Sequence, residues 1–162
     1  MPNWCQNVVY INHENHELVE ELKSKIDGDK EKVLEHILPN PSGEWNYDWC
    51  VSNWGTKWDV SPYEYSINED GALYISFDSA WGPPTGIYEY LYNQGYDVEA
   101  FYNEEGMAFC GWFIDGEDNH YEYSDMSADE IEESLPTKLD EMFSISQYRR
   151  DWELDNEENE EE

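Results

Sequence analysis

Residues 63–77 read YEYSINEDGALYISF, and this stretch decides the fold. Large apolar side chains alternate with Glu64 and Ser66, the letters NEDG follow, and the alternation returns in LYISF. A period of two residues is typical of a strand with one buried face, and a polar cluster containing glycine is typical of a turn. The pattern therefore predicts a β-hairpin over 62–78.

Further elements are predicted on both sides of this hairpin. They are a strand over 7–12, helices over 14–26 and 30–37, a helix over 87–94, strands over 96–102 and 107–114, and a short strand over 120–124. Their order contains strand–helix–strand–strand–helix–strand, the split βαβ arrangement of a ferredoxin-like sandwich. The predicted fold is α+β, an antiparallel sheet with extra strands and a C-terminal helix.

The chain divides into three parts by pattern. Residues 1–124 are predicted to form the ferredoxin-like domain, and 125–150 to form a helical extension that opens with the capping box Ser127-Ala-Asp-Glu130. The remainder, 151–162, is strongly acidic and poor in side chains that a core could bury. Such a composition predicts a disordered tail.

Charge is the most unusual property of the composition. The chain has 8 basic and 39 acidic residues, a formal charge of −31, yet 16% of its residues are aromatic. The aromatic content argues against a disordered chain, because large rings supply a core. The charge argues against direct binding to nucleic acid or anionic lipid and favours a partner with a basic surface.

Cysteine and histidine patterns indicate neither a disulfide framework nor a metal site. Cys5, Cys50 and Cys110 are widely spaced without a CxxC pair, and the four histidines show no ligand spacing. We therefore expect buried thiols, no metal and no cofactor. A start without a signal-peptide pattern, no long apolar run and unpaired cysteines lead us to expect a cytoplasmic protein, that of the host if a phage encodes it.

Catalytic motifs are also missing from the sequence. It has no GxSxG, no P-loop and no HExxH. A Cys–His pair could be drawn with Cys5 or Cys110, but nothing marks either thiol as activated. The protein is predicted not to be an enzyme.

Four blocks of sequence resemble one known family. They are MPNWCQN (1–7), WCVSNWGTKWD (49–59), FDSAWGPP (77–84) and YNEEGMAFCGWF (102–113). Together they are similar to the YubB-type ferredoxin-like proteins of phages and plasmids, although Ser79 and Gly82 stand where that family more often has Thr and Ser. The resemblance implies the ferredoxin-like fold and an origin in a mobile element, and it implies no catalytic residue.

The first functional hypothesis rests on acidic residues of the predicted strands and turns. The proposed partner-binding residues are Glu64, Asp97, Glu99, Glu104, Glu105, Asp115, Glu117, Asp118 and Glu122. Alternate strand residues repeat at about 6.6 Å, near the spacing of phosphates along a nucleic-acid strand. The protein would then act as a DNA mimic that inhibits a host nuclease, defence effector or other nucleic-acid-binding protein. A solvated surface that serves solubility remains the alternative.

The second hypothesis concerns the stretch SNWGTKWD (52–59). Trp54, Lys57, Trp58 and Asp59, with Trp81, would form a pocket for a nucleotide or signal molecule, in which rings stack on the ligand and the lysine binds phosphate. The alternative is packing, in which the rings close one end of the sheet and the lysine pairs with a neighbouring carboxylate.

Overall fold

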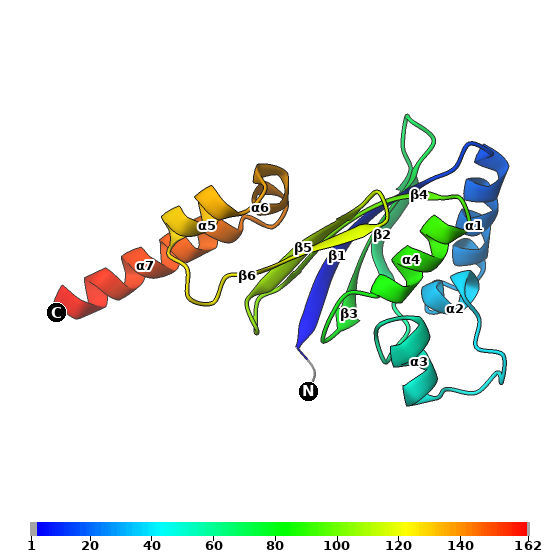
Figure 1. The fold of residues 1–162 in the computed structure, drawn as a ribbon, viewed down its shortest axis with the longest axis horizontal. Coiled ribbons are helices and arrows are strands. Elements are labelled where there is room, and N and C mark those ends of the chain that lie inside the picture. The colour runs from blue at the N-terminus through cyan, green and yellow to red at the C-terminus, as the bar shows by residue number, and fades with distance from the viewer. Residues whose placement is uncertain (1–2, 162) are drawn as a thin grey trace.

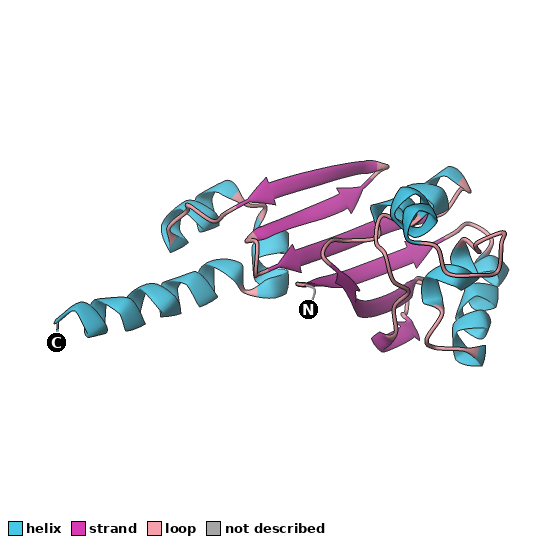
Figure 2. Ribbon diagram, turned by 90° about the horizontal axis from the view of Figure 1, so that it is seen from below, coloured by secondary structure: helices cyan, strands magenta, loops and turns pink. Residues whose placement is uncertain are grey.

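The computed structural model describes residues 3–161 and shows an α+β protein built on one antiparallel sheet (Figures 1 and 2). The strands are β1 (Trp4–Asn12), β2 (Pro62–Ile67), β3 (Leu73–Ala80), β4 (Asp97–Glu104), β5 (Phe109–Ile114) and β6 (Glu117–Glu122). Their spatial order is β2-β3-β1-β4-β5-β6, and every neighbouring pair is antiparallel. The predicted hairpin is confirmed as β2 and β3, whereas β6 begins earlier than predicted.

Seven helices accompany the sheet within the described residues. They are α1 (His16–Gly28), α2 (Val33–Ile37), α3 (Tyr47–Asn53), α4 (Thr85–Asn93), α5 (Ala128–Ser134), α6 (Thr137–Phe143) and α7 (Ile145–Glu161). The first four lie on one face of the sheet, and the last three form a separate group with the C-terminus (Figure 1). The sheet therefore lies between an N-terminal and a C-terminal helical layer.

The N-terminal layer buries the larger core. Val9 and Ile11 of β1 point to the same side as Leu73 and Ile75 of β3, and they pack with apolar residues of α1, α2 and α4. All four side chains are at most 3% exposed. This face follows directly from the two-residue period, since residues paired across antiparallel strands share a side of the sheet.

The opposite face carries a second, smaller core under the C-terminal helices. Phe101 of β4 and Cys110 of β5 are buried there against Ile131, Leu139 and Ile145 of α5, α6 and the start of α7. The predicted C-terminal helical extension thus packs on the sheet. It forms three helices, because Pro136 follows α5 and Ser144 takes a left-handed conformation after α6.

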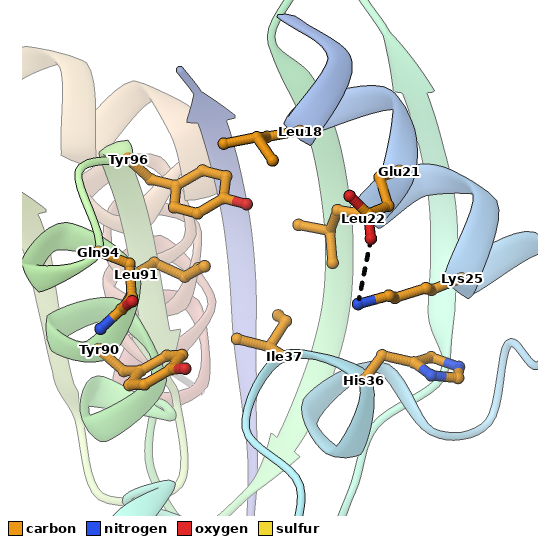
Figure 3. Close-up of a pocket in the computed structure, with 10 residues that line it drawn as sticks. All are labelled: Leu18, Glu21, Leu22, Lys25, His36, Ile37, Tyr90, Leu91, Gln94 and Tyr96. Carbon is orange, nitrogen blue, oxygen red and sulfur yellow. Dashed lines mark ion pairs between the residues drawn. The ribbon is translucent and has the colours of Figure 1, made fainter. Parts of the chain in front are cut away.

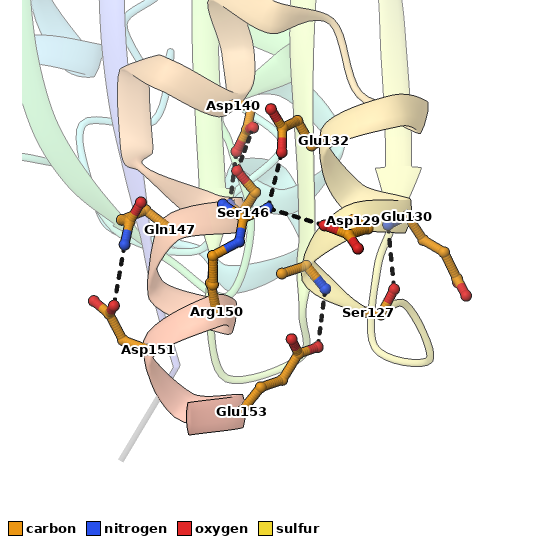
Figure 4. A network of polar contacts seen from close by, with 11 residues as sticks. Ser127, Asp129, Glu130, Glu132, Asp140, Ser146, Gln147, Arg150, Asp151 and Glu153 are labelled. Atoms are coloured by element: carbon orange, nitrogen blue, oxygen red, sulfur yellow. Dashed lines mark hydrogen bonds and ion pairs between the residues drawn. The ribbon is translucent and has the colours of Figure 1, made fainter. Parts of the chain in front are cut away.

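The acidic tail differs from its prediction, since α7 continues through Glu161; Glu162 lies outside the described residues. Contacts to α5 hold the first half of this helix (Figure 4). Arg150 pairs with Asp129 at 3.2 Å and Glu132 at 2.8 Å, and the Glu153 carboxylate accepts a hydrogen bond from the backbone N–H of Ala128. Sequence composition could not show these contacts, which come from a helix about twenty residues earlier in the chain.

Candidate functional site

Exposed tryptophans gather at the end of the sheet where β1 begins. Trp4, Trp58 and Trp81 are 48%, 39% and 57% exposed, and the Trp4 and Trp58 ring centroids lie 6.1 Å apart. The Lys57 ammonium lies 4.3 Å from the ring centroid of Trp58 and 4.3 Å from that of Trp81. We call Trp4, Trp58, Trp81 and Lys57 the tryptophan end. Two indole rings enclose one cation there, a favourable cation–π arrangement.

Hydrogen bonds between neighbouring loops hold this arrangement in place. The buried Thr56 hydroxyl donates to the carbonyl of Ala80 at 2.9 Å, and the Trp81 N–H donates to the carbonyl of Asn3 at 2.7 Å. The indole N–H of Trp45 donates to the carbonyl of Lys57 at 2.8 Å. The loop after α3, the turn after β3 and the start of β1 are therefore fastened together.

A buried polar network supports the same turn from inside. Asn7 donates to the Ser79 hydroxyl at 2.8 Å and accepts from the Tyr88 hydroxyl at 2.7 Å, and Ser79 donates to the carbonyl of Gly82 at 2.6 Å. Asn7, Ser79 and Tyr88 are each at most 2% exposed. Buried polar groups that are fully paired specify a single geometry, because every alternative leaves a donor or acceptor unpaired.

Trp81 itself has a strained backbone. Its φ is 68°, in the left-handed region that a bulky side chain seldom adopts. Such a conformation costs on the order of 1–3 kcal/mol and concentrates at functional sites. The ring is 57% exposed, so burial offsets little of this cost.

Two members of the predicted ligand pocket have structural roles, which corrects that prediction. Trp54 is 4% exposed, and its indole N–H donates to the carbonyl of Leu38 at 2.9 Å. The Asp59 carboxylate accepts from the backbone N–H groups of Leu34 and Glu35, at 2.7 and 3.0 Å, at the start of α2. Burial raises the pKa of Asp59 above its ordinary value. Only Lys57, Trp58 and Trp81 of the predicted pocket reach the surface together.

The packing alternative predicted that Lys57 pairs with a neighbouring carboxylate, and this part of it is incorrect. Among the described residues no carboxylate lies within 4.0 Å of its ammonium, which contacts the two rings instead of Asp59. The side chain is half-buried. Among the described residues Lys30 and Lys32 also have no carboxylate within 4.0 Å, so what distinguishes Lys57 is its position between two indole rings.

Carboxylates gather at the opposite end of the sheet, which we call the acidic end. Asp70, Asp97, Glu99 and Asp115 line a hollow of about 400 Å³ beside Lys138 of α6. They come from the β2–β3 turn, the start of β4 and the β5–β6 turn. Lys138 forms an ion pair with Glu99 at 2.8 Å. Three of the predicted partner-binding residues, Asp97, Glu99 and Asp115, are thus brought together here.

Glu104 does not belong to a surface, contrary to its prediction. It is 1% exposed, and its two carboxylate oxygens accept from the backbone N–H groups of Gly106 and Met107, each at 2.8 Å. The carboxylate holds the β4–β5 turn. Its neighbour Glu105 is exposed, but it lies in the same turn and so at the tryptophan end.

The remaining predicted residues do not form one row with the acidic end. Asp118 and Glu122 share one face of β6 with His120 between them, whereas Glu117 points to the other face. Asp118 also accepts a hydrogen bond from the Tyr102 hydroxyl at 2.8 Å. Glu64 is exposed on β2, at the far edge of the sheet. A continuous duplex-like row of carboxylates is therefore not present along these strands.

The helical layer has a hollow of its own. It measures about 330 Å³ and lies between α1, α2 and α4, lined by Leu18, Leu22, Ile37, Leu91 and Tyr96 among others (Figure 3). Its ion pair, Lys25–Glu21 at 3.8 Å, joins successive turns of α1. We interpret the apolar residues of this lining and the Lys25–Glu21 ion pair as parts of the packing between the three helices.

The expectation of buried thiols is confirmed. Cys5, Cys50 and Cys110 are all free and buried. Burial raises the pKa of each thiol, that of Cys110 to about 12, so the thiolate that a nucleophile requires is disfavoured. Within the described side chains, no group of three His, Cys, Asp or Glu residues is arranged to hold a metal.

Comparison with family models, with curated proteins and with solved structures finds no match. Among the described helices, none has the length and apolar character needed to cross a membrane.

Two features of the site escaped the sequence analysis. Trp4 was not assigned to the site. Its neighbour Cys5 is buried, and because successive side chains of a strand point to opposite faces, Trp4 points away from that buried face. The left-handed Trp81 has no sequence signal, because glycine or asparagine would normally mark that conformation.

Proposed function

We propose that this protein is a non-enzymatic binding protein that inhibits a nucleic-acid-binding or defence protein of a host cell by occupying its basic surface. The observation that supports this most is the balance of charge. Five carboxylates pair with Lys or Arg among the described side chains, against 39 acidic residues in the chain. An excess of this size steers a basic partner toward the protein.

The proposed scaffold is ferredoxin-like. Strands β2, β3, β1 and β4 are adjacent in that order, and helices α1 and α4 lie in the β1–β2 and β3–β4 connections. This order supports the split βαβ arrangement, with β5, β6 and the C-terminal helices as additions to it. Together with the four sequence blocks, it supports a relation to the YubB-type proteins of phages and plasmids, and hence a host protein as the target.

The acidic end is the part of the surface proposed to attract the partner. Asp70 and Asp115 on turns and Asp97 at the start of β4 are exposed around one hollow, where their charges add and cationic side chains can enter. Charge of this kind accelerates association and weakens steeply with salt, since exposed charges are screened beyond about 8 Å at physiological ionic strength.

The test is affinity capture from a bacterial host lysate with the tagged full chain. We expect a nucleic-acid-binding protein that is released by about 0.5 M salt and by duplex DNA added as a competitor. Asp70→Asn/Asp97→Asn/Asp115→Asn should lose the captured protein. The matched control Glu20→Gln/Glu31→Gln/Glu89→Gln removes the same charge from exposed positions of the helical layer and should retain it. Captured proteins that resist both salt and DNA would contradict the proposal.

A second candidate function uses the tryptophan end. Lys57 held between Trp58 and Trp81 favours a small nucleotide or signal molecule whose base stacks on an indole. Tryptophan fluorescence titrated with a nucleotide panel tests it. A saturable change that Trp81→Ala abolishes would support this candidate, and no change with any nucleotide would remove it.

A further inference from the structure

We propose that Trp58 and Trp81 form an aromatic cage for an arginine or lysine side chain of the basic partner, and that Lys57 is an internal occupant which this side chain displaces. The inference rests on the proposed function, because it names the contact that anchors the partner. It assigns the anchor to the tryptophan end, away from the acidic end that attracts the partner.

The cage already holds an ammonium group 4.3 Å from both ring centroids, so its geometry suits a cation. Lys57 is the one basic residue between Lys32 and Lys138. It has an aromatic contact and, among the described side chains, no carboxylate within 4.0 Å, so a competing cation would break no ion pair.

The cage is also preorganised. Thr56 and Ala80 tie the loop of Lys57 to the turn of Trp81, and the backbone of Trp81 is held at a φ of 68°. Strain that burial does not offset indicates a presented side chain. A rigid tryptophan loses little conformational freedom on binding, which is why tryptophan and arginine dominate the strongest contacts in protein interfaces.

The charge around the cage also favours a cationic ligand. Asp78 lies on the same face of β3 as Ala80, and Ala80 pairs with Trp4 of β1. The Asp78 carboxylate accepts a hydrogen bond from the Tyr63 hydroxyl. On the other side, Gly106 lies against Asn3, which places exposed Glu105 and Met107 beside the start of β1. Apolar rings flanked by carboxylates are complementary to arginine, which offers a planar cation. An anionic ligand would meet the repulsion of the whole molecule.

The experiment uses the full chain and a short fluorescein-labelled peptide of alternating glycine and arginine, with lysine and citrulline versions. We expect the arginine peptide to bind more tightly than the lysine peptide and the uncharged citrulline peptide not to bind. Trp81→Ala should weaken binding about tenfold, the size of one strong cation–π contact. The matched control Trp152→Ala, at an equally exposed tryptophan of α7, should stay within twofold.

Removal of the Lys57 ammonium tests displacement more directly, because it should increase the affinity for the arginine peptide. Lys57→Gln should tighten arginine-peptide binding at least threefold, because the cage no longer holds a competing cation. Lys25→Gln removes the same charge from exposed helix α1 and should change affinity less than half as much. Equal effects of the two substitutions would overturn displacement, and an unchanged affinity of Trp81→Ala would overturn the cage.

The outcomes also separate this inference from the proposed function. If the arginine peptide binds with steep salt dependence but Trp81→Ala and Trp152→Ala behave alike, the cage is wrong and charge-driven binding stands. If no cationic peptide binds at any salt concentration, both are wrong. Binding of a nucleotide that Trp81→Ala abolishes, with no peptide binding, would assign the tryptophan end to the second candidate function.

Discussion

At the end of the sheet where β1 begins, exposed tryptophans are held by buried hydrogen bonds, whereas at the opposite end carboxylates stand on turns around an open hollow. The tryptophan end has one fixed geometry because its polar supports are paired and enclosed. The acidic end needs no such support, because charge acts at a distance and tolerates movement. Rigidity and charge are therefore supplied by different ends of one sheet.

The largest effect should come from breaking the buried network that supports the tryptophan end. Asn7→Leu leaves the buried Tyr88 hydroxyl without its acceptor and removes the donor to the Ser79 hydroxyl, which keeps only its own bond to Gly82. An unpaired buried polar group costs about 1–3 kcal/mol. We expect a loss of about 3 kcal/mol in the free energy of unfolding, measured by urea denaturation. Asn12→Leu, on the same strand at the acidic end, should cost less than about 1 kcal/mol. Equal losses would contradict the contrast between the ends.

A smaller effect is expected from the β4–β5 turn. Glu104→Gln weakens two charge-assisted hydrogen bonds to Gly106 and Met107, which should lower the free energy of unfolding by about 2 kcal/mol. Glu105→Gln changes the exposed neighbour and should be neutral within about 0.5 kcal/mol. Thermal and urea unfolding of the two variants decide this. A neutral Glu104→Gln would mean that the buried carboxylate does not hold the turn.

Two substitutions of Trp81 distinguish the effect of its backbone strain on stability from the effect of its ring on peptide binding. Trp81→Gly and Trp81→Ala remove the same ring, but only glycine accepts the left-handed backbone without cost. We expect the glycine variant to be more stable than the alanine variant by about 1 kcal/mol in urea denaturation. Both should lose peptide binding equally. A more stable alanine variant would show that the turn carries no strain.

The acidic end should give the smallest change, and of opposite sign. Asp97→Asn/Asp115→Asn removes mutual repulsion on exposed turns and should raise the free energy of unfolding by about 0.5 kcal/mol at low salt. The gain should disappear at about 1 M salt, where screening is nearly complete. A gain that persists at high salt would indicate a role in packing.

The sequence analysis succeeded where periodicity is decisive. The alternation of apolar and polar residues identified β2 and β3. Strand β5, which contains Cys110, has a neighbouring strand on each side, as the apolar character of this stretch predicts. Helix α3 was missed because it is short and depends on a side-chain cap, in which Asn46 accepts from the backbone N–H of Trp49 at 2.9 Å. Periodicity cannot detect a helix of seven residues that depends on a cap of this kind.

Site residues were harder to assign, because the same residue types serve surface and structure. Glu104 and Glu105 are adjacent carboxylates in one turn, yet one is buried and the other exposed. Trp54 and Trp58 are likewise close in sequence, yet Trp54 is buried in the core of the helical layer and Trp58 is 39% exposed. Such distinctions depend on contacts between distant segments, such as Thr56 with Ala80, and a single sequence does not contain them.

The most direct test of the whole account is kinetic. Association and dissociation rates of the arginine peptide should be measured by stopped-flow for the native chain and two variants. We expect Asp70→Asn/Asp97→Asn/Asp115→Asn to slow association several-fold with dissociation unchanged, and Trp81→Ala to speed dissociation about tenfold with association within twofold. That result would assign attraction to the acidic end and retention to the tryptophan end. If both variants change the same rate constant, this division of roles between the two ends is wrong.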